Sequence, residues 1–447
     1  MKKKTAKSAL TRRDFLKGST LATAGAFLAP SIVPATVFGS NAPSERITIG
    51  VIGTGRIART ADIPEMLKID GTQIVAVCDV DSKRVKDAKA QVDQYYSKKY
   101  GVVDAKGCGT FGDFRELLAR DDIDAVMICT PDHWHSIPAI AAAAAGKDIF
   151  IQKPLSLTIA GGRAVSDAVT KAGRILQIGS QQRSHPKFRQ ACELVRNGRI
   201  GKLHTVKVGL PGDPGGQDEP EMPVPPNLDF DMWLGCTPVV PYTEKGVHPQ
   251  KDYSRPGWLR IETYGAGMIT GWGSHHLDTA QWGMGTELTG PISVEGEAEF
   301  PKSGLWNVHG DFRLEYTYKN GVKVIAADNK RNAQGVRFEG SEGWIYVKRW
   351  SIDAEPKSIL TSKIADDEIH LHKSDNHKQD FIDAVKARTA PVAPVEVGHR
   401  SCTVCLLGQI AMKAGRKLKW DPDTERFVDD DAANKLLTRP MRAPWKI

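Results

Sequence analysis

The stretch ITIGVIGTGRIA, residues 47–58, decides the fold of the N-terminal half of the chain. Its first half has the apolar, β-branched composition of a buried strand, and its second half turns through GxGxxA into a helical pattern. Gly53 permits the tight turn and Gly55 lets the backbone approach a pyrophosphate, while the following helix points its N-terminus at that anion. The stretch therefore predicts a dinucleotide-binding turn. The residues predicted to contact the cofactor there are Gly53, Thr54, Gly55, Arg56 and Ile57.

A second strand-like run, QIVAVCD, ends in Asp79. An acid at this distance beyond the glycine turn accepts hydrogen bonds from the adenosine ribose hydroxyls, and it repels a 2′-phosphate. Asp79 therefore favours NAD over NADP, although the nearby Lys83 and Arg84 leave NADP open.

The alternation of strand-like and helical runs continues to residue 183. The strands AVMICT (125–130) and DIFIQKP (148–154) frame an alanine-rich helix, so we expect a doubly wound parallel sheet, a Rossmann domain over 45–183. Ligands bind at the carboxyl ends of such strands. Further cofactor contacts are therefore predicted for Thr130, Pro131, His135, Gln152 and Lys153.

The C-terminal half is predicted to form a second α/β domain over 184–430, followed by a tail over 431–447. A segment rich in proline, glycine and acids, residues 211–226, is too long for a simple connection and favours a lid or an oligomer arm. Asn320-Gly321 indicates a hairpin turn. Strand composition marks residues 292–300, 311–318, 322–328 and 343–347.

The leader contains TRRDFLK (11–17) and then an apolar run over 21–38 interrupted by prolines. This pattern predicts a twin-arginine signal peptide over 1–40, export of the folded protein by that machinery, and a periplasmic location. A membrane-anchoring helix is the alternative, and the prolines and the short apolar run favour a cleaved leader. Cleavage after Ala35 and after Gly39 both fit.

Charge and cysteine content exclude two further classes of protein. Most of the formal charge of +8 comes from the leader, and no clustered run of Lys and Arg follows it, so we expect no nucleic-acid partner. The seven cysteines are scattered and odd in number, which argues against a disulfide framework. Cys402 and Cys405 form a CxxC in an apolar helical stretch, where buried thiols are expected.

Several separated motifs together resemble the Gfo/Idh/MocA oxidoreductase family. They are VIGTGRIA, CTPDHWH followed by AGKDIFIQKP, NGRIGKL, GMITGWGSHHLDTAQWGMG, DFIDAV and PVEVGHRS. The resemblance covers nearly all of the chain after the leader. It implies a C-terminal α/β domain with a large, mostly antiparallel sheet that backs the substrate pocket and forms homo-oligomer contacts.

The resemblance also implies a catalytic pair. The family has Glu-Lys-Pro where this chain has Gln152-Lys153-Pro154, and its lysine positions and polarises the reacting hydroxyl; Lys153 is matched to it. The family histidine that takes the hydroxyl proton is matched to His275. The aspartate four residues before it is replaced by Gly271, so Asp278 is an alternative group to orient His275.

Candidate substrate contacts are spread over both halves of the chain. Aromatic and polar side chains suit a carbohydrate, and they point to Arg183, His185, Tyr253, Trp258 and His276. The clustered histidines and acids in DHWH (132–135) and SHHLD (274–278) are residue types that ligate zinc. Because the family uses this region without metal, no metal is predicted.

These features predict an exported NAD(P)-dependent oxidoreductase that acts on a hydroxyl of a sugar, polyol or glycoside. A periplasmic enzyme has little free dinucleotide around it, so we expect a tightly bound cofactor that is recycled in place. One alternative is a redox-neutral, NAD-dependent glycosidase or glycoside-modifying enzyme. Another is a non-catalytic, dinucleotide-retaining sugar-binding protein, which the glycine at Gly271 favours.

Overall fold

The computed structural model describes residues 46–101 and 107–447. The signal peptide expected over 1–40 lies outside these residues. Within the described ranges, no helix combines the length and apolar character needed to cross a membrane.

The N-terminal domain is a six-stranded, wholly parallel sheet in the order β3-β2-β1-β4-β5-β6. The strand order reverses between β1 and β4, which creates the crevice where ligands bind in doubly wound sheets. The strands are β1 Ile47–Ile52, β2 Thr72–Cys78, β3 Gly109–Phe111, β4 Ala125–Ile128, β5 Asp148–Ile151 and β6 Leu176–Ile178.

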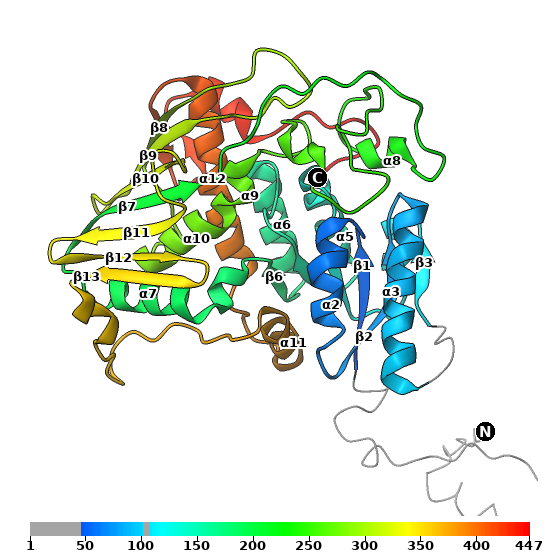
Figure 1. Cartoon of the computed structure of the whole chain (residues 1–447), viewed down its shortest axis with the longest axis horizontal. Helices are drawn as coiled ribbons and strands as arrows, with labels where there is room; N and C mark the ends of the chain where they lie inside the picture. The colour runs from blue at the N-terminus through cyan, green and yellow to red at the C-terminus, as the bar shows by residue number, and fades with distance from the viewer. Residues whose placement is uncertain (1–45, 102–106) are drawn as a thin grey trace, which may run out of the picture. The chain divides into compact units, whose positions relative to one another are not determined.

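Helices cover both faces of this sheet (Figure 1). A π-helical turn Ala58–Asp62 leads into α2 Ile63–Met66, and these pack with α3 Ser82–Tyr100 on one face. The C-terminal helix α11 His377–Ala387 returns to the same face, where Phe381 and Ile382 join the core. The other face is covered by α4 Phe114–Leu118, α5 Ser136–Ala144 and α6 Ile159–Lys171.

The C-terminal domain is built on a nine-stranded sheet in the order β13-β12-β11-β7-β10-β9-β8-β14-β15. All of its neighbouring strands are antiparallel except β7 and β10. The fold class predicted from the sequence is therefore confirmed. The strands are β7 Leu203–Leu210, β8 Ser293–Ala298, β9 Phe312–Thr317, β10 Lys323–Asp328, β11 Gly335–Gly340, β12 Gly343–Lys348, β13 Ser351–Glu355, β14 Leu418–Asp421 and β15 Arg426–Phe427.

Three helices pack on one face of this sheet: α7 Pro186–Arg196, α10 Gly273–Met284 and α12 Val395–Ala414. Helix α12 also packs on α6, so the two domains share one continuous apolar core. The buried Cys402 and Cys405 lie on α12, as free thiols. Shorter helices are α8 Phe230–Leu234, α9 Met268–Gly271 and α13 Asp431–Asn434.

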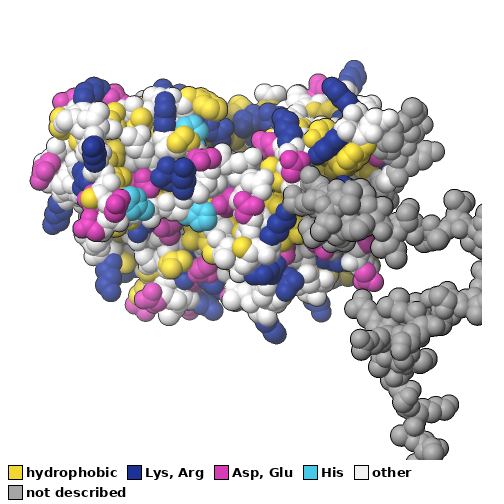
Figure 2. Space-filling view, turned by 90° about the horizontal axis from the view of Figure 1, so that it is seen from below, with side chains coloured by type: hydrophobic (Ala, Val, Ile, Leu, Met, Phe, Trp, Pro, Cys, Tyr) yellow, Lys and Arg dark blue, Asp and Glu magenta, His cyan; other side chains and the backbone are white. Residues whose placement is uncertain are grey.

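The surface carries charges of both signs. In the view of Figure 2, Lys and Arg side chains are interspersed with Asp and Glu. On β7 and β11, for example, Lys207 and Arg337 both pair with Glu339.

Candidate active site

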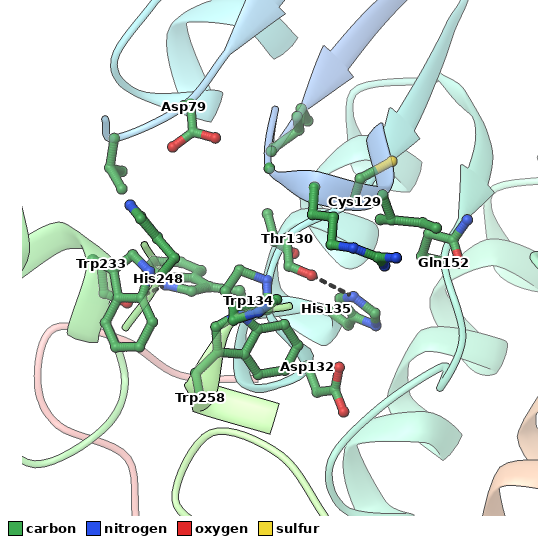
Figure 3. A pocket seen from close by; sticks show the side chains of 18 of the residues that line it. Asp79, Cys129, Thr130, Asp132, Trp134, His135, Gln152, Trp233, His248 and Trp258 are labelled. Carbon is green, nitrogen blue, oxygen red and sulfur yellow. Dashed lines mark hydrogen bonds between the residues drawn. The ribbon is translucent and has the colours of Figure 1, made fainter. Parts of the chain in front are cut away.

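A cleft opens at the carboxyl ends of β1, β2, β4 and β5, where the strand order of the parallel sheet reverses (Figure 3). Its other wall comes from the C-terminal domain, chiefly from the segment between β7 and α10. The cleft is lined by the predicted cofactor residues Gly53, Gly55, Arg56, Ile57, Asp79, Thr130, Pro131, His135, Gln152 and Lys153, and by Asp132, His248, Arg255, Trp258 and Gly271 among others.

The two glycines of the turn have different requirements. Gly53 has a φ of +85°, and a Cβ there would lie 2.7 Å from the carbonyl carbon of Cys129 and the nitrogen of Thr130. Gly55 has no atom within 4 Å of its would-be Cβ, so the backbone there faces open cleft. The first glycine is thus required by the fold, and the second leaves room for a pyrophosphate.

Asp79 is fixed at the end of β2 by the same turn. Its Oδ2 accepts hydrogen bonds from the backbone nitrogen of Thr54 at 2.6 Å and from the Thr54 hydroxyl at 3.1 Å. Its Oδ1 accepts one from the backbone nitrogen of Asp81 at 3.0 Å. The carboxylate is only half-buried and lines the cleft, where the sequence predicts a contact with the adenosine ribose.

A segment of the C-terminal domain, residues 227–255, crosses back over the N-terminal domain; we call it the strap. Its first contact is made beside β2, where the backbone nitrogen of Ser82 donates to Asn227 and that of Asp229 donates to Val80. His248 of the strap lies 3.0 Å from Oδ2 of Asp81. The strap therefore borders the cleft beside Asp79, on the side predicted to hold the adenosine, which we call the adenosine half.

Asp81 anchors the strap as a buried carboxylate. It caps α3 by accepting from the backbone nitrogens of Lys83 and Arg84, and it also accepts from Asn227. Burial alone would raise the pKa of Asp81, but the hydrogen bonds of His248 and Asn227 outweigh burial and lower the pKa to about 2. The group is therefore ionised at all ordinary pH values.

Lys83 and Arg84, the two cations near Asp79 that left NADP binding possible, each contact another residue of the protein. Lys83 pairs with Asp87, and the buried Arg84 donates to the carbonyl oxygen of Pro249 in the strap at 2.7 Å. The Arg84 guanidinium also lies 4.7 Å from the ring centroid of Tyr253. Arg84 is thus held by the strap and Lys83 is paired at the surface, which favours NAD.

Tyr253 was predicted to contact substrate, and the structure corrects this. Its hydroxyl donates to Asp87 at 2.8 Å, and its ring lies under the guanidinium groups of Arg59 and Arg84. The side chain therefore fastens the strap to the start of α3, beside the adenosine half of the cleft.

Lys153 follows the end of β5 by two residues and lines the cleft. We call the part of the cleft around Lys153 its reactive half. Within the described part of the chain, its amine makes neither a hydrogen bond nor an ion pair. Burial lowers the pKa of Lys153, and the nearby Asp132 opposes that shift, whereas Arg255 and Arg349 add to it. An unpaired lysine of lowered pKa facing a cleft has the character of a catalytic group.

Gln152, beside Lys153, holds a buried acid that the sequence reasoning missed. Its amide nitrogen donates to both oxygens of Asp62, at 3.0 and 2.8 Å. Lys378 of α11 also donates to Asp62, at 2.5 Å. Gln152 therefore lines the cleft while its amide is used to satisfy Asp62 on the helical turn that follows the glycines.

His135 ties two strand ends together. Its Nδ1 lies 2.5 Å from the carbonyl oxygen of Pro154. Its Nε2 lies 2.9 Å from that of Thr130, the contact drawn in Figure 3. Burial lowers the pKa of His135 to about 4. The imidazole is therefore neutral, and its single N–H donates to one of these two carbonyl oxygens, which follow β4 and β5.

His275 lies on α10, buried, close enough to Lys153 for their charges to interact. Its Nδ1 has no hydrogen-bond partner among the described residues. Burial lowers the pKa of His275 far below the ordinary value, and the charges of Lys153 and Arg349 lower it further. A histidine in this state is a weak proton acceptor at neutral pH.

Asp278 does not orient His275, which corrects a second expectation. Its carboxylate accepts two hydrogen bonds from Arg183, both 2.8 Å long, and a third from Ser401. Arg183 also pairs with Glu287, so its guanidinium is buried in an internal ion-pair network. Arg183, predicted as a substrate contact, is therefore structural.

The remaining substrate candidates, His185, Trp258 and His276, lie in different surroundings. The Nδ1 of His276 lies 3.0 Å from the carbonyl oxygen of Gly209, and this side chain packs beside Trp272, away from the residues that line the cleft. His185 accepts from the backbone nitrogen of Lys187 as the N-cap of α7 and packs against Trp350. Trp258 does line the cleft, as predicted.

Gly271 faces the cleft with space around it. A Cβ there would meet only the methyl and sulfur of Met268, at 3.4 and 3.7 Å. The glycine is therefore not required by packing, and the carboxylate that the family carries at this position has no substitute on α9 or α10. No group of three or more His, Cys, Asp or Glu side chains in the described ranges is arranged to hold a metal ion.

Two family models match the chain. The NAD-binding Rossmann fold of the GFO_IDH_MocA oxidoreductases matches residues 47–180, and their C-terminal alpha/beta domain matches residues 214–447. Together with the cleft described above, this shows that the chain belongs to the Gfo/Idh/MocA family of oxidoreductases and that its N-terminal domain binds NAD.

Individual relatives are distant. The chain is 28% identical to an uncharacterized oxidoreductase, YrbE, of Bacillus subtilis, over 67% of this chain and 73% of that protein. It is 34% identical to the myo-inositol 2-dehydrogenase of Thermotoga maritima, but over only 41% of this chain and 47% of the relative. The chain thus spans less than half the length of this inositol dehydrogenase.

Solved structures share the fold. The WlbA dehydrogenase of Bordetella pertussis, in complex with NADH and UDP-GlcNAcA, superimposes with a TM-score of 0.62 at 18% identity, over 84% of this chain and 99% of that one. The aldose-aldose oxidoreductase of Caulobacter crescentus, complexed with glycerol, gives 0.58 at 20% identity over the same shares.

Proposed function

We propose that this protein is an NAD-dependent oxidoreductase that oxidises a hydroxyl of a sugar or polyol with a cofactor that stays bound. The observation that carries the proposal is the unpaired Lys153 in the reactive half of an NAD-binding cleft. Support for the substrate class comes from the inositol dehydrogenases and sugar-acting enzymes to which the chain is similar.

The cleft residues fit NAD and divide the work of holding it. The open backbone at Gly55 leaves space for the pyrophosphate, and Asp79 accepts from the adenosine ribose hydroxyls. When bound, NAD supplies the acceptor for the hydride that leaves the substrate carbon. Lys153 donates a hydrogen bond to the substrate oxygen and stabilises the charge that develops on it as its proton leaves.

The strap supports retention of the cofactor. It lies over the adenosine half of the cleft and is fastened by the buried Asp81, by Arg84 and by Tyr253. A dinucleotide can leave that half only after these contacts break, so release is slow. Retention is needed if the protein is exported to the periplasm by the twin-arginine route, as the leader sequence indicates; recycling then requires a second carbonyl substrate or re-reduction of the first product.

The proposed homo-oligomer would use the face of the nine-stranded sheet opposite α7, α10 and α12. Partly exposed polar side chains such as Lys207, Glu315 and Arg337 lie on this sheet and could pair with a second copy. Size-exclusion chromatography with light scattering tests this, and a monomer at micromolar concentration would contradict it.

Cofactor content is the first test of the proposed function. The full chain is purified and denatured, and the released dinucleotide is identified and quantified; we expect NAD(H) close to one per chain. Myo-inositol and D-glucose are then added to the native protein while the absorbance of NADH is followed. A protein that is empty and binds neither NAD nor NADP would contradict the proposal, whereas release of an aglycone from a nitrophenyl glycoside without net reduction would indicate the redox-neutral alternative.

A further inference from the structure

Asp132 is a buried acid in the cleft for which the structure provides no partner. It begins the short turn Asp132–Trp134 after β4, and its side chain is only 5% exposed. Among the described residues, no other residue donates a hydrogen bond to its carboxylate or forms an ion pair with it; only its own backbone N–H reaches it. In the view of Figure 3 it is drawn below His135 and beside Trp258. A buried carboxylate without partners is costly to ionise, so its presence calls for a functional reason.

A second cavity lies on the other side of Asp132. It is formed between the start of α5, the C-terminal half of α12 and the tail that follows α13. Its polar lining includes Glu262, which pairs with Lys413, and Arg439, which donates to the carbonyl oxygen of Glu262 at 2.6 Å. Exposed residues such as Pro238 and Thr438 stand at its rim, so water reaches it.

Among residues 46–101 and 107–447, Asp132 is the one that lines both the cleft and this second cavity. Asp132 therefore contributes to the walls of both the cleft, which Lys153 also lines, and a compartment that water reaches.

The charged and titratable groups around Asp132 leave Lys153 as the one that stabilises its ionised form. From its own turn, His133 and His135 are neutral, because burial lowers the pKa of each to about 4. From α12, Cys402 is a neutral thiol, because burial raises its pKa to about 11. Across the second cavity, Lys413 and Arg439 are turned to Glu262.

Burial consequently raises the pKa of Asp132 to about 7, with Lys153 opposing the shift. The protonated and ionised forms are then both populated near neutral pH, which is the condition under which proton transfer in either direction is efficient. His275 does not meet this condition, because its pKa lies far below neutrality.

We propose that Asp132 carries the proton between the substrate hydroxyl held by Lys153 and the water of the second cavity. This inference rests on the proposed function. In it, Asp132 serves in place of the family aspartate, which Gly271 replaces in this chain. In the oxidation step the C–H bond breaks and its electron pair leaves as hydride to NAD⁺. The O–H bond breaks, a carbonyl forms, and the hydroxyl proton moves to the Asp132 carboxylate and then to water. Reduction of a carbonyl runs the same path backwards.

The first experiment requires no substrate. Infrared difference spectra of the NAD-loaded full chain are recorded between pH 5 and pH 9 for the wild type, Asp132→Asn and the matched control Glu262→Gln, which removes a carboxylate from the same second cavity. We expect a carboxylic C=O band that disappears with a midpoint near pH 7 in the wild type and in the control, and that is absent from Asp132→Asn. A band that persists in Asp132→Asn, or no band in the wild type, would overturn the proposal.

The second experiment measures proton transfer during turnover. With whichever of myo-inositol and D-glucose reduces the bound cofactor in the wild type, Asp132→Asn is expected to slow reduction ~100-fold with little change in KM and to lose the pH dependence near neutrality. Added formate should restore part of the rate, which a merely structural role would not allow, and Glu262→Gln should stay within about twofold of the wild type.

The two failures are distinguishable. If Asp132→Asn keeps the wild-type rate and pH profile, the relay is wrong although the oxidoreductase stands. If the wild type reduces its cofactor with neither compound, the substrate class is wrong, and the infrared titration still decides whether Asp132 titrates as the relay requires.

Discussion

The two halves of the cleft differ in how their polar groups are satisfied. In the adenosine half, Asp79, Asp81 and Arg84 already have partners from the glycine turn, α3 and the strap. In the reactive half, the side chains of Lys153 and Asp132 have no hydrogen bond or ion pair with another described residue, and the charge of each shifts the pKa of the other. The first half is organised to hold a ligand in a fixed place, and the second keeps groups free to exchange hydrogen bonds and protons with a substrate.

The largest expected effect is on the reactive half. Lys153→Met should lower the rate of cofactor reduction about 10³-fold, because it removes the donor that stabilises charge on the substrate oxygen. NAD content after purification should stay unchanged, since the adenosine half is intact. Stopped-flow absorbance measures the rate and dinucleotide analysis measures the NAD content, with Lys202→Met at an exposed position as the control. If Lys153→Met loses its NAD, the two halves of the cleft do not act separately.

Replacing each turn glycine by alanine should separate folding from binding. Gly53→Ala places a Cβ against backbone atoms of Cys129 and Thr130 at a positive φ, so it should cost about 2–3 kcal/mol of unfolding free energy and empty the cleft. Gly55→Ala meets nothing in the protein, so it should leave stability unchanged and weaken NAD binding about tenfold. Denaturant unfolding and calorimetry check both, and equal stability losses would contradict the assignment.

The strap anchor should set how slowly NAD leaves. Asp81→Asn keeps an acceptor for the cap of α3 but removes the charge beside His248, and we expect NAD dissociation to accelerate about tenfold, or about 1.4 kcal/mol. Because the pKa of Asp81 is depressed in the folded chain, its contribution is complete above the unfolded value of about 4 and is lost as pH falls from there towards 2.

Retention of NAD should therefore be independent of pH between 5 and 8 and should fail on acidification below about pH 4 in the wild type. Fluorescence of bound NADH during rapid dilution follows the release. A midpoint near neutrality would show that a group other than Asp81 fastens the strap.

The smallest effect is expected at the edge of the strap. Tyr253→Phe removes the hydroxyl that donates to Asp87 and keeps the ring under Arg59 and Arg84, so NAD dissociation should rise about threefold to fivefold. The rate of cofactor reduction should not change. A larger effect on the rate of cofactor reduction than on the rate of NAD dissociation would show that Tyr253 contacts the substrate.

The sequence alone was enough to predict the features that depend on residues close together in the chain. Gly53, Gly55 and Asp79 follow strands in a fixed spacing, and the strand ends at Thr130 and Lys153 had to meet in a parallel sheet. Contacts between distant segments could not be predicted this way. His248 reaches Asp81 from 167 residues away, and Asp278 turns to Arg183 rather than along its own helix to His275.

Asp132 was visible in the motif CTPDHWH, but it was weighed only as a metal ligand. Its importance depends on its burial and on the absence of a paired side chain among the described residues. A local sequence pattern shows neither of these. The same holds for Asp62, whose charge is matched by Gln152 and by Lys378 of α11, 316 residues away.

Strand β7 has a consequence for folding. It pairs only with β10 and β11, which follow it by more than a hundred residues, whereas the hairpins β9–β10 and β11–β12 join neighbours in sequence. Closing such a long loop is slow, so β7 should enter the sheet after the hairpins have formed. The strap follows β7 after the connecting segment 211–226, so it should not reach Asp81 in its native position earlier. Nascent chains should therefore acquire a retained nucleotide only in the last kinetic phase of folding.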